Sequence, residues 1–411
     1  MAEPYGPLLT GMTVEGFLSF GDATEIRLEP LNVFIGPNGS GKSNLVEAVA
    51  VLRAVPRDLP QPIREGGRSV RDWLWKPDPA STEPASRKAA HSARIELAFT
   101  GGRIAQHHTK PAVRYRLVFG AQGDSFVVLD ERLENADRPS DKEKPSFYFG
   151  YEHGRPMLNV RDRGRGSRRE LRREALDMTQ SILSQRRDPE EYPELGRLTD
   201  ALERIRIYRR WQFGPAATVR EACSPSVRAD HLSENFDNLP ARLAVLKRDP
   251  IVKRRMLELI RELSPGFNDF EVVPEGGVLT LYLIEGDLSV PARRISDGTL
   301  RFLCLLAILV DPAPPPLIVI EEPELGLHPD IHSQLAMLLL DASSRTQLIV
   351  TTHSDIMVDA LTETPESIVV CEKVRGCTQL KRLSAKRLEP WLNKYRLGEL
   401  WLRGEIGGTR W

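Results

Sequence analysis

A glycine-rich stretch near the start of the chain has the residue types and spacing of a phosphate-binding loop. Residues 36–43 read GPNGSGKS and fit the pattern GxxxxGK[ST]. In such a loop the glycines let backbone N–H groups face phosphate oxygens, the lysine reaches the β- and γ-phosphates, and the final hydroxyl ligates Mg²⁺. We expect Lys42 to be catalytic as well and Ser43 to be a metal ligand. The residues expected to bind ATP are those of the pattern and the residue after it: Gly36, Pro37, Asn38, Gly39, Ser40, Gly41, Lys42, Ser43 and Asn44.

Two later apolar runs end in polar residues that could act on a phosphate. The run 317–320 ends in Glu321 and Glu322. A carboxylate at a strand end can hold Mg²⁺, and its neighbour can polarise the attacking water. The run 348–350 is followed by Thr351, Thr352 and His353, and a histidine at this place can sense or stabilise the γ-phosphate. We therefore expect Glu321 to be a metal ligand, and Glu322 and His353 to be catalytic.

A third polar group, Ser296-Asp297-Gly298, precedes the apolar stretch 300–309. It offers a hydroxyl and free amides at a helix N-terminus, which together can bind an anion. Taken alone, the pattern is more typical of an ordinary helix cap.

The elements that position these groups follow from hydrophobic periodicity. The loop lies between a predicted buried strand at 31–35 and a helix from residue 42 whose apolar residues at 45, 46, 49 and 52 form one stripe. Strands at 317–320 and 347–351, with a helix at 329–343, can pair with the first strand in one parallel sheet. Strands at 93–99, 113–119, 125–133 and 146–151 predict an antiparallel sheet. Apolar steps of three and four predict that 160–264 is helical, with helices at 171–182, 195–205 and 250–263.

Composition excludes several classes of protein. The 411 residues contain 57 Lys+Arg and 57 Asp+Glu, so no whole-chain field favours nucleic acid or a membrane. The four cysteines fit neither a CxxC redox site nor a zinc site, which predicts reduced thiols. The start of the chain lacks a signal-peptide pattern, and the longest apolar run, 302–310, is too short to span a bilayer. We expect a cytoplasmic protein that does not contact a membrane.

The order of these motifs resembles the ABC-type ATPase heads of the RecF/SMC-like group, and in particular the stand-alone bacterial RecF-like AAA family ATPases. The resemblance rests on VEGFLSFGDATEIRLEPLNVFIGPNGSGKSNL, SDGTLRFL, IVIEEPELGLHP, TTHS and LGELWLRGEIGGTRW. It implies an α/β P-loop NTPase fold of the ABC/SMC-head type, with an antiparallel β subdomain and a helical insertion. The implied parts are an N-terminal ATPase lobe at 1–155, an Arg-rich helical insertion at 156–265 and a C-terminal ATPase lobe at 266–411.

The resemblance also implies roles for the site residues. ATP would be the substrate, with Mg²⁺, and would be hydrolysed to ADP and phosphate. Glu321 would be the Walker B acid and Glu322 the catalytic base. Residues 296–299, the signature-like loop, would touch ATP bound by another copy of the chain through Ser296, Asp297 and Gly298, and residues 324–328 would cross that interface. ATP would then drive formation of a homodimer.

The sequence leaves the partner open. Residues 155–255 hold 23 basic and 15 acidic residues, a local excess that suits contact with DNA phosphates or merely solvated helical faces. One hypothesis is an ATP-driven dimerising switch that acts on DNA in repair, recombination or genome defence, with Arg168, Arg169, Arg172 and Arg173 on the DNA. The alternative is a regulatory ATPase subunit that binds a separately encoded protein effector, such as a nuclease.

Overall fold

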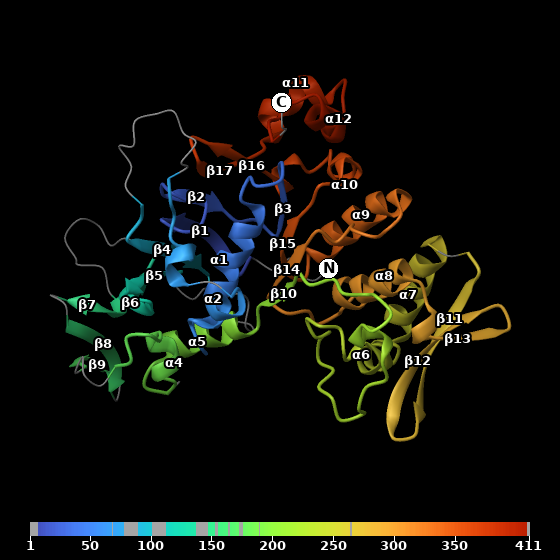
Figure 1. Ribbon diagram of the computed structural model, residues 1–411, viewed down its shortest axis with the longest axis horizontal. Helices are drawn as coiled ribbons and strands as arrows, with labels where there is room; N and C mark the ends of the chain where they lie inside the picture. Colours follow the sequence, from blue (N-terminus) through green and yellow to red (C-terminus); the bar gives the residue numbers. More distant parts are fainter. Residues whose placement is uncertain are drawn as a thin grey trace. The chain divides into compact units, whose positions relative to one another are not determined.

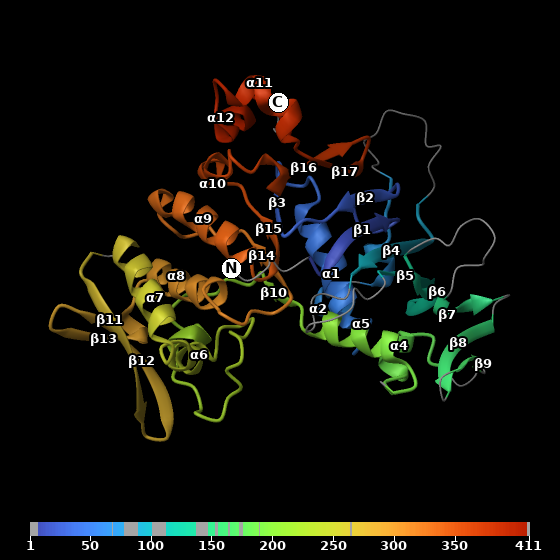
Figure 2. The ribbon, with the colours of Figure 1, turned by 180° about the vertical axis from the view of Figure 1, so that it is seen from behind.

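The computed structural model describes residues 7–67, 69–77, 89–100, 112–136, 147–152, 155–162, 165–171, 176–188, 190–263 and 265–408. The chain divides into two compact units, which Figures 1 and 2 show from opposite sides. The first unit comprises Met1–Ile205, Glu366–Leu388 and Gly404–Trp411. The second unit comprises Arg206–Pro365 and Glu389–Arg403.

A large antiparallel sheet dominates the first unit, with strand order β2-β1-β4-β5-β6-β7-β8-β9. In β4 every second residue is buried, from Ala93 to Phe99, so one face of the strand lines the core. The strands are β1 (Leu9–Glu15), β2 (Thr24–Arg27), β4 (Ser92–Phe99), β5 (Val113–Gln122), β6 (Ser125–Asn135), β7 (Phe147–Glu152), β8 (Arg155–Asp162) and β9 (Arg165–Glu170).

A second layer of the first unit carries the phosphate loop. Strand β3 (Leu31–Ile35) is buried along its whole length, as its apolar sequence predicts, and pairs in parallel with β16 (Ile368–Val374). Strand β17 (Cys377–Arg382) pairs with β16 in the antiparallel sense. Helix α1 (Lys42–Ala54) follows the loop and packs against α2 and α5. The other helices of this unit are α2 (Gln61–Glu65), α3 (Val70–Trp73), α4 (Ile182–Gln185) and α5 (Pro193–Glu203).

Three parallel strands form the centre of the second unit. Strand β14 (Leu317–Glu321) pairs with β10 (Arg206–Tyr208) on one side and with β15 (Gln347–Thr351) on the other. Glu321 and Thr351 are in register, so the carboxyl ends of β14 and β15 meet at one edge. The neighbouring helices are α8 (Asp297–Leu309), α9 (His332–Ala342), α10 (Asp355–Ala360) and α12 (Leu397–Leu402).

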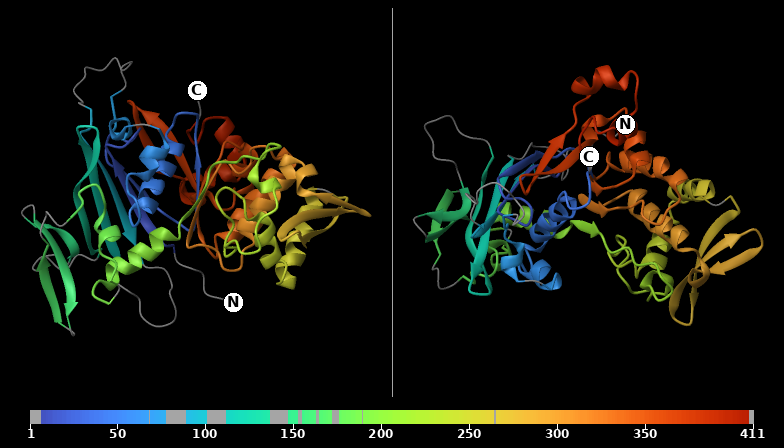
Figure 3. Two further views of the ribbon diagram at one scale, coloured as in Figure 1. Left: turned by 60° about the horizontal axis from the view of Figure 1, so that its bottom comes forward. Right: turned by 45° about the horizontal axis from the view of Figure 1, so that its top comes forward.

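A small antiparallel sheet, β11-β12-β13, completes the second unit and packs against α6 and α7 (Figure 3). Helix α11 crosses from the residues of one unit to those of the other. The remaining elements are α6 (Leu239–Leu246), α7 (Pro250–Leu263), α11 (Ala385–Leu392), β11 (Phe267–Glu275), β12 (Val278–Glu285), β13 (Leu288–Pro291), and the 3₁₀ turns η2 (Thr218–Arg220), η3 (Ala292–Arg294), η4 (Pro329–Ile331) and η5 (Pro365–Ser367).

The predicted helices at 195–205 and 250–263 are confirmed as α5 and α7. Asp249 caps α7, since its Oδ1 accepts hydrogen bonds from the backbone N–H groups of Ile251 (2.8 Å) and Val252 (3.3 Å).

The prediction of a helical segment from residue 160 is wrong at its start. Strands β8 and β9 occupy 155–162 and 165–170, and within 171–182 residues 172–175 lie outside the described part. Beyond them Asp177 Oδ1 accepts from the Thr179 N–H (2.8 Å) and hydroxyl (2.7 Å). This local side-chain bonding competes with helix formation, and among the described residues from 176 on the first helix is the short α4.

Candidate functional site

The phosphate loop of the first unit depends on glycine at three positions. Gly36, Gly39 and Gly41 have φ values of 147°, 78° and 107°, which L side chains rarely adopt. A Cβ on Gly36 would lie 2.2 Å from the Cys371 carbonyl oxygen, and one on Gly41 would lie 2.1 Å from Thr378 Oγ1. At Gly36 and Gly41 the backbone therefore runs directly over β16 and β17, with no space for a side chain.

Lys42 lies within its own loop. Its Nζ donates to the carbonyl oxygens of Gly36 (2.7 Å) and Pro37 (3.0 Å), and the side chain is buried. Ser43 is exposed at the first turn of α1, as are Asn38 and Gly39 in the loop. The Ser40 hydroxyl is buried and has no hydrogen-bond partner among the described residues, so it is a candidate donor to a phosphate oxygen.

Two residues that the sequence analysis missed hold this loop in place. Thr378 of β17 donates its backbone N–H to the Ser19 carbonyl (2.8 Å), and its Oγ1 lies 2.8 Å from the Ser40 carbonyl oxygen and 2.7 Å from Ser19 Oγ. Asn44 Nδ2 donates to the same Ser19 hydroxyl (2.7 Å). No local pattern marks Ser19 or Thr378, because they are 359 positions apart.

The thiol of Cys371 lies in the strand beneath the loop. Burial raises its pKa to about 12, and the nearby Lys42 ammonium lowers it by a smaller amount. The thiol is therefore neutral at physiological pH and acts as an apolar group under the loop.

In the second unit the structure brings Glu322 and His353 together. Glu322 follows β14 in a left-handed conformation (φ 48°), and its N–H donates to the Thr351 carbonyl (2.9 Å). This turn directs its carboxylate to His353, with Oε1 3.5 Å from Nε2. Both side chains are about one-third exposed, so water can reach them.

Glu324 has a structural role that the sequence did not show. Its Oε1 accepts from the Thr352 hydroxyl (2.6 Å) and from the His353 backbone N–H (2.8 Å), and the side chain is 5% exposed. The predicted interface segment 324–328 thus begins with a carboxylate that faces its own unit. Leu325, Gly326 and His328 are exposed.

The signature-like loop caps α8. Ser296 Oγ accepts from the Thr299 N–H (3.1 Å), and a Cβ on Gly298 would lie 3.2 Å from the Gly326 carbonyl oxygen. The Asp297 carboxylate forms an ion pair with Arg220, a buried residue that the sequence analysis did not single out.

The predicted site residues therefore form two groups. Residues 36–44 gather in the first unit with Ser19 and Thr378, whereas Glu321, Glu322, His353 and the signature-like loop belong to the second. Their arrangement around one nucleotide stays a prediction.

No group of three or more His, Cys, Asp and Glu side chains suited to a metal ion occurs in the described part of the chain. None of the helices described there has the length and apolar character needed to cross a bilayer.

Comparison with known proteins identifies a family and a fold. Residues 102–359 match the family described as "AAA domain, putative AbiEii toxin, Type IV TA system", and residues 12–185 match a family described as "AAA domain". Over 43 residues, 10% of this chain, the sequence is 51% identical to the chromosome partition protein Smc of Mycobacterium leprae and to that of Mycobacterium tuberculosis. The chain spans only 4% of the length of these curated relatives.

Solved structures of Smc heads have the same fold. One is an Smc head bound to the C-winged helix domain of ScpA (TM-score 0.56, 16% identity, 93% of this chain and 99% of that one). Another is an Smc head with an extended coiled coil, bound to the C-terminal domain of ScpA derived from Pyrococcus furiosus (TM-score 0.56, 15% identity, 94% and 99%). The predicted fold class, a P-loop NTPase of the ABC/SMC-head type with antiparallel sheet, is confirmed.

Proposed function

Because the chain belongs to the AAA domain family described as a putative AbiEii toxin of a type IV TA system, we propose that it is a Mg²⁺-dependent ATPase that dimerises on ATP. The observation that carries the proposal is the phosphate loop, with three glycines in conformations that L side chains rarely adopt and a lysine inside the loop. Backbone N–H groups in such a loop, together with the N-terminus of α1, favour phosphate oxygens. Lys42 would leave its two carbonyl partners to bind the β- and γ-phosphates.

The residues present suit Mg²⁺, which prefers oxygen ligands and is commonly held by one or two protein groups together with substrate phosphates. Ser43 offers an exposed hydroxyl and Glu321 a partly exposed carboxylate, so these two would hold the ion. When bound, Mg²⁺ neutralises charge on the phosphates.

Glu322 and His353 would carry out the chemical step. The Glu322 carboxylate accepts a proton from the water that attacks the γ-phosphorus, and ADP and inorganic phosphate leave. His353, 3.5 Å away, orients that carboxylate and can donate to a γ-phosphate oxygen. Glu324 fixes His353 through its backbone N–H.

Two copies of the chain would enclose ATP, with the signature-like loop of one copy on the nucleotide of the other. Ser296 and Asp297 are exposed, which leaves them open to a partner. We place this switch on DNA, in repair, recombination or genome defence, because of the basic excess in 155–255. Of the four predicted DNA contacts, Arg172 and Arg173 lie outside the described residues, and only the backbone of Arg168 and Arg169 is described.

The second candidate function is regulation of a protein effector. It is favoured by the solved Smc head that binds the C-winged helix domain of ScpA, a separate protein. ATPase measurements with and without duplex DNA separate the candidates, because stimulation by DNA favours the first. Co-purification of a nuclease that inhibits or depends on the ATPase favours the second.

The test of the proposed activity is Lys42→Ala. Without this cation the loop cannot neutralise the β- and γ-phosphates, so binding of a fluorescent ATP analogue and hydrolysis should both be lost. Lys394→Ala, at an exposed lysine of the second unit, is the matched control and should behave as the parent. Parental ATP binding and turnover in Lys42→Ala would show that the loop assignment is wrong.

A further inference from the structure

Trp211 is hydrogen-bonded to the residue predicted to hold Mg²⁺. It follows β10, the strand beside β14, and its indole Nε1 donates to the Glu321 carbonyl oxygen with an N···O distance of 2.6 Å. This hydrogen bond constrains the backbone at the residue whose carboxylate is predicted to hold the ion. No nucleotide motif includes Trp211.

An aromatic stack holds the indole in place. The ring centroid of Trp211 lies 5.2 Å from that of Phe236 and 6.2 Å from that of Phe213, with interplanar angles of 19° and 16°. The Arg301 guanidinium lies over the same group, 5.0 Å from the Trp211 centroid and 5.2 Å from that of Phe213. Arg301 belongs to α8, the helix that the signature-like loop opens. The aromatic stack therefore contacts both the end of β14, through Trp211, and helix α8, through Arg301.

Arg220 connects the same segment to the signature-like loop. Its Nε donates to the Phe213 carbonyl (3.0 Å), its Nη1 donates to the Ile295 carbonyl (2.7 Å), and its Nη2 pairs with Asp297. The buried Arg220 guanidinium thus binds both the Ile295 backbone, just before the signature-like loop, and the Asp297 carboxylate within that loop. Because the fork is planar and has several donors, a lysine cannot reproduce these contacts.

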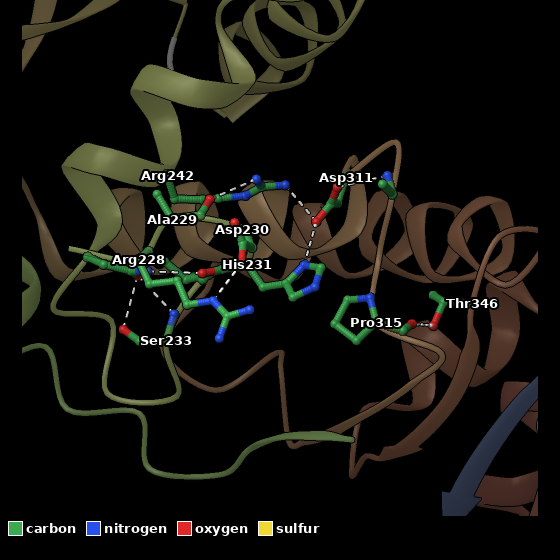
Figure 4. A network of polar contacts seen from close by, with 12 residues as sticks. Arg228, Ala229, Asp230, His231, Ser233, Arg242, Asp311, Pro315 and Thr346 are labelled. Atoms are coloured by element: carbon green, nitrogen blue, oxygen red, sulfur yellow. Dashed lines mark hydrogen bonds and ion pairs between the residues drawn. The ribbon is translucent and has the colours of Figure 1, made fainter. Parts of the chain in front are cut away.

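A second network fixes the loop that supplies Phe236. Phe236 has a φ of 63°, which a non-glycine residue keeps only when its surroundings impose it. The chain is anchored at Asp311 on both sides of Phe236: His231 before it and Arg242 after it approach this carboxylate, at 3.4 Å and 2.6 Å (Figure 4). Arg242 and Asp311 are each 4% exposed. The loop that supplies Phe236 to the stack is therefore anchored by a buried ion pair.

We propose that Trp211 and Arg220 are positioning residues that link the signature-like loop to the strand end bearing Glu321 and Glu322. The inference rests on the proposed ATPase function. A partner's nucleotide that contacts Ser296–Gly298 would pull on Arg220 and α8, and the stack would transmit the shift through Trp211 to the Glu321 carbonyl. Nucleotide bound by one copy would in this way set the metal ligand of the other.

Trp211→Phe isolates the hydrogen bond from the stack, because phenylalanine keeps an aromatic ring but lacks the N–H. The kcat for ATP should fall about fivefold, the effect of one hydrogen bond, and half-maximal activity should need more Mg²⁺. Affinity for a fluorescent ATP analogue in EDTA should not change, since the phosphate loop is untouched. Trp391→Phe makes the same change at a tryptophan that is 44% exposed and should alter neither quantity.

Arg220→Lys, alone and combined with Trp211→Phe, tests the link itself. If the two residues act through one network, the double variant should lose less activity than the product of the single losses. Multiplicative losses would refute the link. Parental kcat and Mg²⁺ dependence in Trp211→Phe would refute the role of Trp211 while leaving the ATPase intact. A parent that neither binds nor hydrolyses ATP would refute the proposed function, and this inference with it.

Discussion

Replacing Glu324 should show how far the second unit depends on one buried carboxylate. Glu324→Leu keeps a side chain of similar size but removes the acceptor of the Thr352 hydroxyl and the His353 N–H. Both donors would then lack this acceptor. They would also be largely shielded from water, since the Glu324 side chain is only 5% exposed. Glu324→Gln keeps a carbonyl oxygen in the same place and removes only the charge.

The cost can be worked out from these contacts. Each buried donor without a partner costs about 1–3 kcal/mol, so the free energy of unfolding should fall by about 4 kcal/mol in Glu324→Leu. In Glu324→Gln two neutral bonds replace charge-assisted ones, a loss of about 1 kcal/mol. For a unit of this size 1 kcal/mol corresponds to about 2–4 °C, which predicts Tm decreases of about 12 °C and about 3 °C.

Thermal unfolding followed by circular dichroism, with ATPase assays at a temperature where every variant is folded, measures both effects. Glu324→Leu should also lose turnover, because the His353 backbone is no longer held, whereas Glu324→Gln should keep most of it. Glu363→Leu, at an exposed glutamate, is the control and should change Tm by about 1 °C or less. Equal Tm decreases in the Leu and Gln variants, or a parental Tm in the Leu variant, would refute the reasoning.

Three further predictions concern hydrolysis, pH and salt. Glu322→Gln should bind Mg·ATP but hydrolyse it far more slowly, because water activation is lost, and it should therefore accumulate as a dimer. Light scattering that finds only monomer at saturating ATP would contradict the proposal that two copies enclose ATP. Burial raises the pKa of Glu131, so its stabilising contribution is complete below its unfolded pKa near 4.5 and is lost as pH rises through the higher folded value. In urea titrations the parent should therefore lose stability relative to Glu131→Gln as the pH rises above 4.5, and a constant difference would argue against an ionising buried carboxyl. Replacing Arg168, Arg169, Arg172 and Arg173 with Ser should weaken DNA binding and flatten its log–log salt slope by about 0.9 for each lost phosphate contact, with basal ATPase retained; an unchanged slope would remove these residues from the DNA-binding surface.

The fold was most predictable from sequence where consecutive residues define an element without help from distant parts of the chain. Strand β3, the phosphate loop and α1 form one continuous run, so hydrophobicity and glycine placement define all three. The contact between Glu322 and His353 follows from topology, because β14 and β15 are parallel neighbours whose carboxyl ends meet at one edge.

The supporting residues could not be predicted, because tertiary contacts alone define them. Trp211 reaches a carbonyl 110 positions away, and Arg220 reaches Asp297 across 77 positions. Neither lies in a recognisable pattern, since an indole N–H or a guanidinium can find an acceptor anywhere in a folded unit. Glu324 is next to a motif, yet only the structure shows that its carboxylate turns inward.

Tertiary contacts also decide which arginines of 155–255 could bind DNA, and a count of charges in the sequence does not show this. Arg220 and Arg242 contribute to the basic excess but are buried in ion pairs with Asp297 and Asp311, where they stabilise the second unit and cannot meet a phosphate. In contrast, Arg254 and Arg255 are exposed on α7 and have no ion pair within the described residues. Cations of this second kind would set the salt dependence of the proposed DNA binding, because only they could release counterions on contact. A basic sequence segment thus predicts a DNA-binding surface only after its buried, paired arginines are subtracted.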